Sequence, residues 1–391
     1  MDIKFETRCI HGNPLDSLQD ENRAISFPIY QTASFSHIKP GHNESGFDYT
    51  RESNPTRTRL EEVVSSLEGA AGTVAFASGM AAISACFELF AAGDHIICSE
   101  DLYGGVIRLN KVIHVKNGVE TEYVDTTDLQ AVRAAIRPNT KAVYIETPSN
   151  PMMHITDLRS CAELAHEHGL LFIVDNTFLS PYFQNPLLLG ADIVVHSGSK
   201  FLAGHNDTIS GFLCAKDMEI VKKVRLIAKT TGGMLAPFDS WLVMRGIKTL
   251  SVRMERQQEN AGKVAEWLLK QKKITSVLYP GLKEHKGYEI GVQQTSGFGS
   301  MISFYTDSKE TALQMLQKVK IVIFAESLGG TESLLTYPVL QTHPDVPQEM
   351  REHLGITETL LRLSVGLENA EDIIADLEQA LDGSRDERVQ F

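Results

Sequence analysis

Cysteine is scarce in this chain of 391 residues, and the few that occur form no recognisable pattern. They are odd in number, widely separated and include no Cys-x-x-Cys pair, lying at Cys9, Cys86, Cys98, Cys161 and Cys214. This distribution excludes a disulfide framework of the kind that staples small secreted domains, and it excludes a zinc site built from paired cysteines. We therefore expect the chain to work in a reducing cytoplasm.

Positive charge is also in short supply. Lys and Arg number 37 against 50 Asp and Glu, which gives a formal net charge of −13. A general nucleic-acid binder presents a basic face, so this class of protein is disfavoured. The deficit also means that helix N-termini and a few well-placed arginines must hold any anionic ligand.

Long apolar runs are absent as well. No stretch approaches the roughly 18 uninterrupted apolar residues of a membrane-spanning helix, and the first residues lack the cationic region and apolar segment of a secretory signal. Nor do histidines show metal-ligand spacing, because His166 and His168 would not face one site on a helix. The sequence predicts no membrane contact and no metal site.

What the chain does have is an alternation of strand and helix patterns. Residues 1–60 are irregular, and their prolines are expected to break any helix, so this segment has no core of its own. Residues 61–248 predict an α/β domain. Its apolar strands are expected at Thr73–Ala77, His95–Cys98, Lys141–Ile145, Leu171–Val174 and Asp192–Val195, with helices between them at Met80–Phe90, Asp128–Ala135 and Leu158–His168.

This alternation predicts a mostly parallel central sheet covered by helices on both faces, and ligands bind such sheets at the carboxyl ends of the strands. Residues 249–391 predict a smaller α+β domain that opens with a long amphipathic helix over Thr249–Gln271. Its further strands and helices are expected at Gly299–Tyr305, Lys309–Val319, Leu361–Val365 and Ala370–Leu381.

Four features carry residue types suited to chemistry. The turn Ala77–Met80 joins a strand to a helix and offers free N–H groups to a phosphate. Asp175 ends an apolar strand, Lys200 follows another, and Arg362 lies between apolar residues on a third. Each feature alone also has a plainer explanation, namely an ordinary turn, a helix cap, a lysine that snorkels from a loop, and an arginine paired with a structural carboxylate.

Together the four features predict a site for pyridoxal 5'-phosphate. This cofactor requires a lysine that forms a Schiff base and a carboxylate that keeps the pyridine nitrogen protonated. It also requires a phosphate-binding turn, and its amino-acid substrates require an arginine for the α-carboxylate.

The chain resembles the Cys/Met-metabolism family of pyridoxal-phosphate enzymes, which includes cystathionine γ-synthase and the cystathionine β- and γ-lyases. The resemblance runs from about Thr7 to Leu381. The shared motifs are Tyr49-Thr50-Arg51, Asn54-Pro55-Thr56-Arg57, Ala77-Ser78-Gly79-Met80, Asp101-Leu102-Tyr103-Gly104-Gly105, Glu146-Thr147-Pro148-Ser149-Asn150-Pro151, Asp175-Asn176-Thr177-Phe178, Ser197-Gly198-Ser199-Lys200, Glu326-Ser327-Leu328-Gly329-Gly330 and Arg362-Leu363-Ser364-Val365-Gly366.

The resemblance implies an α/β fold of the aspartate-aminotransferase-like type (fold type I), with its mostly parallel central sheet and smaller C-terminal domain. It also implies roles for the matching residues. Lys200 resembles the internal-aldimine lysine, Asp175 the partner of the pyridinium nitrogen with Thr177 beside it, and Tyr103 the aromatic that stacks on the cofactor ring. The residues expected to bind the phosphate are Gly79, Met80, Ser197 and Ser199.

The resemblance further implies that two chains share each site. Arg51 and Tyr49 match residues that reach the neighbouring subunit's cofactor, so residues 1–60 are expected to form an arm and the chain to form a homotetramer, a dimer of catalytic dimers. The family more often has a glycine where this chain has Ser53. The residues expected to contact substrate are Arg362, Asn150, Ser327 and Glu326.

The expected function is a carbon–sulfur lyase of sulfur amino-acid metabolism that cleaves L-cystathionine by β- or γ-elimination. The alternative is γ-replacement, as in cystathionine γ-synthase or an O-acyl-homoserine sulfhydrylase. A pseudoenzyme that only binds ligands is disfavoured because the implied catalytic residues are all present. Gly105 departs from the cysteine of methionine γ-lyases, which disfavours that activity.

Overall fold

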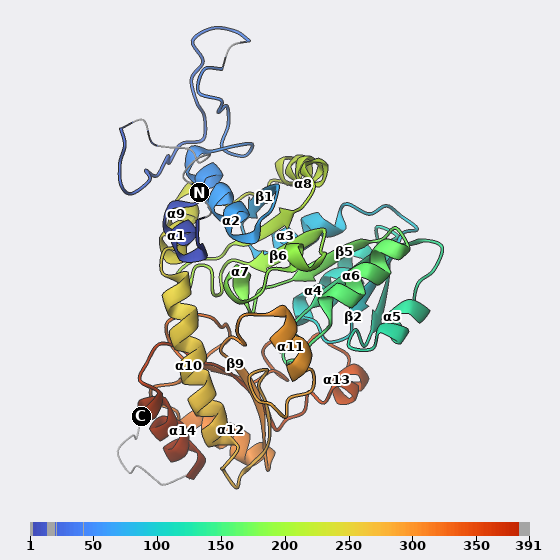
Figure 1. The fold of residues 1–391 in the computed structure, drawn as a ribbon, viewed down its shortest axis with the longest axis vertical. Helices are drawn as coiled ribbons and strands as arrows, with labels where there is room; N and C mark the ends of the chain where they lie inside the picture. The colour runs from blue at the N-terminus through green and yellow to red at the C-terminus, as the bar shows by residue number, and fades with distance from the viewer. Residues whose placement is uncertain (1–2, 14–19, 21, 42, 383–391) are drawn as a thin grey trace.

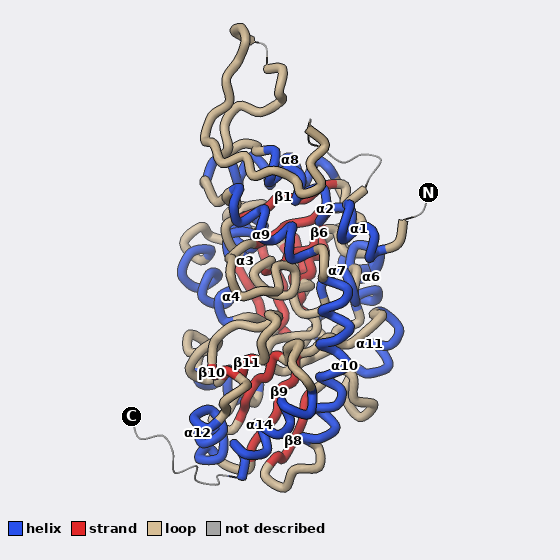
Figure 2. The backbone as a smooth tube through the Cα atoms, turned by 90° about the vertical axis from the view of Figure 1, so that its left-hand side faces the viewer, coloured by secondary structure: helices blue, strands red, loops and turns tan. Residues whose placement is uncertain are grey.

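Two β-sheets follow one another along the long axis of the molecule (Figures 1 and 2). This computed structural model describes residues 3–13, 20, 22–41 and 43–382. One sheet has seven strands and the other has five. The sequence predicts a larger α/β unit followed by a smaller α+β unit, and the two sheets correspond to them.

The seven-stranded sheet is mostly parallel. Its strands are β1 (Gly72–Phe76), β2 (His95–Ser99), β3 (Glu120–Val124), β4 (Thr140–Glu146), β5 (Leu171–Asp175), β6 (Ile193–Ser197) and β7 (Gly211–Ala215). Their spatial order is β1-β7-β6-β5-β4-β2-β3, and only β7 runs antiparallel to its neighbours. The five predicted strands match β1, β2, β4, β5 and β6 to within two residues at each end.

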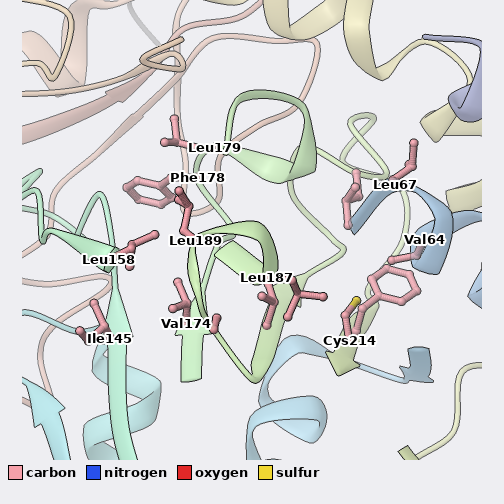
Figure 3. Close-up of a cluster of buried hydrophobic side chains, with 14 of the residues drawn as sticks. Val64, Leu67, Ile145, Leu158, Val174, Phe178, Leu179, Leu187, Leu189 and Cys214 are labelled. Atoms are coloured by element: carbon pink, nitrogen blue, oxygen red, sulfur yellow. The ribbon is translucent and has the colours of Figure 1, made fainter. Parts of the chain in front are cut away.

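Helices cover both faces of this sheet. They are α2 (Pro55–Glu68), α3 (Gly79–Phe87), α4 (Gly104–Leu109), α5 (Leu129–Ala134), α6 (Leu158–Glu167), α7 (Ser180–Phe183), α8 (Met218–Thr231) and α9 (Pro237–Ile247), with a π-turn η1 (Asn110–His114) and a 3-10 turn η2 (Pro186–Leu189). Alternate residues of one strand enter different clusters, because successive side chains point to opposite faces. Val174 belongs to the same buried cluster as Leu67 of α2 and Leu158 of α6 (Figure 3). Ile173 belongs to a second cluster, which includes Ala82 of α3.

The second unit begins with α10 (Leu250–Leu268), which runs from the larger sheet to the smaller one (Figure 1). Its strands have the order β10-β11-β12-β9-β8. Their bounds, and those of the remaining helices, are β8 (Ile274–Leu278), α11 (Tyr288–Gln294), β9 (Met301–Thr306), α12 (Lys309–Lys318), β10 (Ile323–Phe324), β11 (Leu334–Thr336), α13 (Gln348–Leu354), β12 (Leu360–Ser364) and α14 (Ala370–Asp382). Leu268, Phe304, Met315, Leu363 and Ile373 belong to the apolar core between this sheet and its helices.

The N-terminal segment contains helix, contrary to the expectation that its prolines break any helix. Helix α1 (Phe5–His11) ends before Pro14, and α2 begins at Pro55. Proline suits a first helical position because its missing N–H would have no partner there. The Asn54 side chain caps α2 by accepting a hydrogen bond from Thr56 N at 3.0 Å. The division of the chain at residues 60 and 248 stays a prediction.

All five cysteines are buried and unpaired. Within the described ranges, no helix combines the length and hydrophobicity that crossing a membrane requires. The same residues bring no three His, Cys, Asp or Glu side chains together in a metal-binding group.

Candidate active site

A cavity of about 1140 Å³ lies where the carboxyl ends of the parallel strands meet the second unit. Its wall comes from the first turn of α3, the ends of β4, β5 and β6, the segment after β10, and β12. Twelve of the fourteen residues predicted for the site line it, namely Gly79, Met80, Tyr103, Asn150, Asp175, Thr177, Ser197, Ser199, Lys200, Glu326, Ser327 and Arg362.

The start of α3 forms a cradle that suits a phosphate. Ser78 is the N-cap, and its hydroxyl accepts a hydrogen bond from Ala81 N at 3.0 Å. A Cβ at Gly79 would lie 2.9 Å from Ser197 Cβ, so only glycine lets the helix approach the end of β6 this closely. The remaining N–H groups of the first turn and the helix dipole favour an anion here.

Ser197, the last residue of β6, and Ser199, just after it, are placed differently. Ser197 lies against Gly79, whereas the Ser199 hydroxyl is bonded within its own loop. That hydroxyl donates to Ser210 O at 3.2 Å and accepts from Ser210 N at 2.9 Å. Ser199 therefore fixes the loop as well as lining the cavity.

Asp175 is a buried carboxyl held in one orientation. One oxygen accepts hydrogen bonds from Thr177 N at 3.0 Å and Thr177 Oγ1 at 2.6 Å, and the other accepts from Tyr144 OH at 3.4 Å. Burial raises the pKa of Asp175, while these hydrogen bonds oppose the rise. Thr177 also accepts from Ser197 N at 2.9 Å, so it joins the ends of β5 and β6. Asp175 caps its own turn and lines the cavity as well.

Lys200 extends into the cavity and does not snorkel to the surface. Its Nζ donates to Ser327 Oγ at 3.0 Å. Burial, followed by the charge of Arg362, lowers the pKa of Lys200 to about 8. Ser327 has φ of 128°, an uncommon conformation for a residue with a side chain, and such strain concentrates at functional sites.

Arg362 is almost fully buried, and its hydrogen bonds go to neutral oxygens. It donates to Asn150 Oδ1 at 2.7 Å, to Ser327 O at 3.2 Å and to Thr336 Oγ1 at 3.3 Å. Its buried Nε has no hydrogen-bond partner among the described residues. Burial lowers the pKa of Arg362 to about 10. A guanidinium with spare donors in a cavity suits a ligand carboxylate.

These residues together fit pyridoxal phosphate. The cradle at Gly79 suits the phosphate, the buried Asp175 suits a cationic ring nitrogen, and the Lys200 amine suits an aldehyde. Tyr103 lies beside them, and burial raises the pKa of its hydroxyl.

Tyr49 and Arg51 do not line this cavity. Both are exposed, and the Arg51 guanidinium lies 5.0 Å from the centre of the Tyr49 ring. The segment that carries them projects from the body of the chain (Figures 1 and 2). Their contribution to a neighbouring site stays a prediction.

The sequence reasoning missed Glu146 as a site residue, although it lines the cavity and accepts a hydrogen bond from Tyr103 N at 2.9 Å. Its position gave a signal, because Glu146 ends an apolar strand as Asp175 does. The reasoning also missed three carboxylates that come from loops and helices outside the strand ends, namely Asp207, Asp239 and Glu332.

Comparison with known proteins gives one consistent match. A sequence model of the Cys/Met metabolism PLP-dependent enzymes matches residues 6–382. A cystathionine beta-lyase of Lactococcus lactis subsp. cremoris is 43% identical over 378 residues, which cover 97% of this chain and 99% of that protein. A cystathionine gamma-synthase of Haemophilus influenzae is 48% identical over 370 residues, which cover 94% and 95%.

The fold agrees with this match. The crystal structure of cystathionine gamma-lyase from Lactobacillus plantarum, complexed with L-serine, superposes with a TM-score of 0.94 at 44% identity. The superposition covers 97% of this chain and 99% of that one. The three similar proteins differ in the reaction that their names state, so similarity alone does not choose among β-elimination, γ-elimination and γ-replacement.

Proposed function

Because the chain belongs to the Cys/Met metabolism family of PLP-dependent enzymes and has their aspartate-aminotransferase-like fold (fold type I), we propose that it is a carbon–sulfur lyase that cleaves L-cystathionine. Its cofactor is pyridoxal 5'-phosphate. The observation that carries the proposal is the Lys200 amine, held 3.0 Å from Ser327 in a cavity that also contains Asp175 and Arg362.

Substrate binding depends on Arg362. Its spare guanidinium N–H groups bind the α-carboxylate, while Asn150 and Thr336 keep the guanidinium in place. Tyr103 would pack against the cofactor ring, Asp175 would accept the hydrogen bond of the ring nitrogen, and the first turn of α3, with Gly79 and Met80, would bind the phosphate. Glu326 and Ser327 line the same cavity and complete the substrate contacts.

Lys200 moves the proton. Bound pyridoxal phosphate supplies an electron sink for the charge that develops at Cα. The free, neutral Lys200 amine would accept the Cα proton of the substrate, and its lowered pKa makes that neutral form accessible near neutral pH. In β-elimination the Cβ–S bond breaks, homocysteine leaves as the thiolate with the bonding electrons and takes up a proton, and water hydrolyses the remaining three-carbon unit to pyruvate and ammonia. In γ-elimination a Cβ proton is also removed, the Cγ–S bond breaks, cysteine leaves, and water hydrolyses the remaining four-carbon unit to 2-oxobutyrate and ammonia.

The charge of the cavity supports a lyase acting on cystathionine. Besides Glu146 and Asp175, four carboxylates line it, whereas Lys200 and Arg362 are its only lysine and arginine among the described residues. The far end of cystathionine carries an ammonium beside its carboxylate, which an acidic wall attracts, whereas an O-succinyl ester brings a carboxylate with no ammonium beside it. The outer carboxylates are Asp207, Asp239, Glu326 and Glu332.

The γ-replacement alternative is retained because the Haemophilus influenzae relative, named a cystathionine gamma-synthase, is 48% identical. One experiment separates the reactions. The purified holoenzyme is incubated with L-cystathionine, and the keto acid is identified. Pyruvate indicates β-elimination and 2-oxobutyrate indicates γ-elimination. If neither acid forms, while cysteine and an O-acyl-homoserine are joined into cystathionine, the lyase proposal is wrong and the alternative holds.

We also propose that the working enzyme is a homotetramer in which pairs of chains complete each other's sites. The support is the exposed position of Tyr49 and Arg51, outside the cavity of their own chain. Tyr49 is then a further catalytic residue and Arg51 a further phosphate ligand in the neighbouring site. Light scattering of the purified protein measures the oligomeric state.

A further inference from the structure

Glu146 and Asp175 are two carboxyl groups at the ends of neighbouring strands. Glu146 is the last residue of β4 and Asp175 the last of β5, and the two are Cα partners in the parallel register. Neighbouring strands lie about 4.8 Å apart. The exposed fraction is only 6% for Glu146 and 7% for Asp175, and both line the cavity. The chemistry above uses Asp175 and leaves Glu146 without a part.

Glu146 fixes the backbone of Tyr103. Its Oε2 accepts the hydrogen bond of Tyr103 N at 2.9 Å, across 43 residues of sequence. Tyr103 is the residue from which α4 starts, and no side chain of its own caps that helix. On the ring itself, a Cβ at Gly105 would lie 2.5 Å from Tyr103 Cε1, so the ring is closely packed. Gly105 therefore packs against the edge of the Tyr103 ring, and Glu146 holds the backbone N–H of the same residue.

The charges around Glu146 favour its neutral form. The titratable groups that act on it are Asp175 on β5, Asp101 after β2, Tyr144 on β4, Tyr103 before α4 and Arg362 on β12. Burial, and then the charge of Asp175, raise the pKa of Glu146 well above its usual range. The Tyr103 hydrogen bond and Arg362 oppose the rise but rank below these two causes.

Asp175 is better placed to hold a charge. It accepts three hydrogen bonds, two from Thr177 and one from Tyr144, whereas Glu146 accepts one from Tyr103. Two buried carboxyl groups this close do not both ionise. The proton of the pair therefore belongs on Glu146.

We propose that Glu146 is a positioning residue that holds Tyr103 against the cofactor as an uncharged side chain and leaves the negative charge of the carboxyl pair on Asp175. The inference rests on the proposed function only through the place of Tyr103 beside the cofactor. It does not depend on which sulfur compound is the substrate.

Matched amide substitutions test the assignment of charge. Glutamine has the shape of a protonated glutamate and keeps an oxygen for Tyr103 N, so E146Q should bind pyridoxal phosphate within about threefold of the wild-type affinity. D175N also preserves the shape of the side chain, but it removes the negative charge that the ring nitrogen needs. The kcat of D175N should therefore fall at least about 100-fold. The proposal is overturned if E146Q loses cofactor affinity and kcat as severely as D175N.

Infrared spectroscopy of the holoenzyme supplies a readout that does not depend on turnover. Above pH 8, where the neighbouring buried Asp101, whose pKa is raised to about 7, is ionised, the wild type should show the carbonyl band of a buried protonated carboxyl group, and E146Q should lack it. If the wild-type band is missing, or if it persists in E146Q and disappears in D175N, the assignment of the proton is wrong.

Truncation tests the positioning of Tyr103. E146A leaves Tyr103 N without its acceptor, so the visible circular dichroism of the bound cofactor should change and kcat should fall about 100-fold, the cost of a displacement near 1 Å. E146Q should restore both. If E146A lowers the melting temperature but leaves the dichroism unchanged, Glu146 is structural only. The dichroism comes from the bound cofactor and the infrared band from the carboxyl group, so neither requires turnover, and a holoenzyme that fails to cleave cystathionine would contradict the proposed function and not this inference.

Discussion

At the scale of the residue, the pKa of Lys200 is the property with the most direct consequence. Burial and Arg362 lower it to about 8, whereas Glu326 opposes the shift. Only the neutral amine bonds to an aldehyde. We therefore expect the rate at which the cofactor-free protein takes up pyridoxal phosphate to rise with pH around a midpoint near 8, and not near the ordinary lysine value of about 10.4. Stopped-flow absorbance between pH 6 and 10 measures this rate.

Glu326 provides the matched control for Lys200. Its carboxylate stabilises the ammonium form, so E326Q should move the midpoint to lower pH. Lys200→Ala should abolish covalent uptake at every pH. A midpoint that stays above 10 in the wild type would show that the amine is solvated and that the burial argument is wrong.

Arg362 leads to a second prediction at this scale. A lysine at this position keeps the positive charge but lacks the planar guanidinium group, which can donate hydrogen bonds to Asn150 and to a carboxylate at the same time. A hydrogen bond to a charged group contributes about 1.5–3 kcal/mol, so R362K should raise KM for the amino-acid substrate about 10- to 100-fold. The affinity for pyridoxal phosphate should stay within about threefold, because Arg362 contacts neither the cradle nor Asp175. An unchanged KM, measured by steady-state kinetics, would remove Arg362 from the substrate site.

At the scale of the element, the junction between α3 and β6 determines the phosphate site. A methyl group at Gly79 would meet Ser197 Cβ at 2.9 Å and Ser197 Cα at 3.0 Å, so Gly79→Ala should push the start of α3 away from β6. Overpacking of this kind costs about 1–3 kcal/mol, which corresponds to a loss of cofactor affinity of about 5- to 150-fold. A spectroscopic titration with pyridoxal phosphate measures the loss.

Gly233 is the control for Gly79. It lies near the same helix, but a Cβ there would meet nothing closer than Ala81 Cβ at 3.7 Å. Gly233→Ala should therefore leave the cofactor affinity within about twofold. Equal affinities for both variants would mean that the close approach at Gly79 has no part in binding the phosphate.

The elements also show what could be predicted from the sequence. Strands such as β5 and β6 are buried on both faces, so their apolar runs identify them and place Asp175 and Lys200 at their ends. Strand β3 is a polar edge strand and has no such run. Strand β7 does have a short apolar run, but it contains no β-branched residue, so its pattern does not distinguish a strand from a buried piece of helix. Glu146 was missed as a positioning residue because its partner, Tyr103 N, lies 43 residues earlier, and no local pattern reports that contact.

At the scale of the whole molecule, the N-terminal arm is the part that we expect a second chain to use. Residues around Tyr49 pair with Ser34 in a short bridge away from the body, and Glu52 ties the base of the arm to α8 through Lys229 at 2.6 Å. The exposed fraction reaches 99% for Ile25 and 74% for Ile38. Apolar side chains this exposed, on a segment with few internal contacts, favour packing against another chain.

Mixing two defective chains tests whether this arm completes a neighbouring site. R51A should lack the arginine that the arm supplies, and K200A should lack the lysine, so each alone should be nearly inactive. When equal amounts of the two variants are co-refolded, random pairing makes half of the dimers mixed. Each mixed dimer has one site with neither defect and one site with both. About a quarter of all sites are then intact, so about a quarter of wild-type activity should return. The rate of keto acid formation measures the recovery, and native mass spectrometry confirms that mixed dimers form. If mixed dimers form and no activity returns, Arg51 serves the site of its own chain, and the exposed position of the arm has another cause.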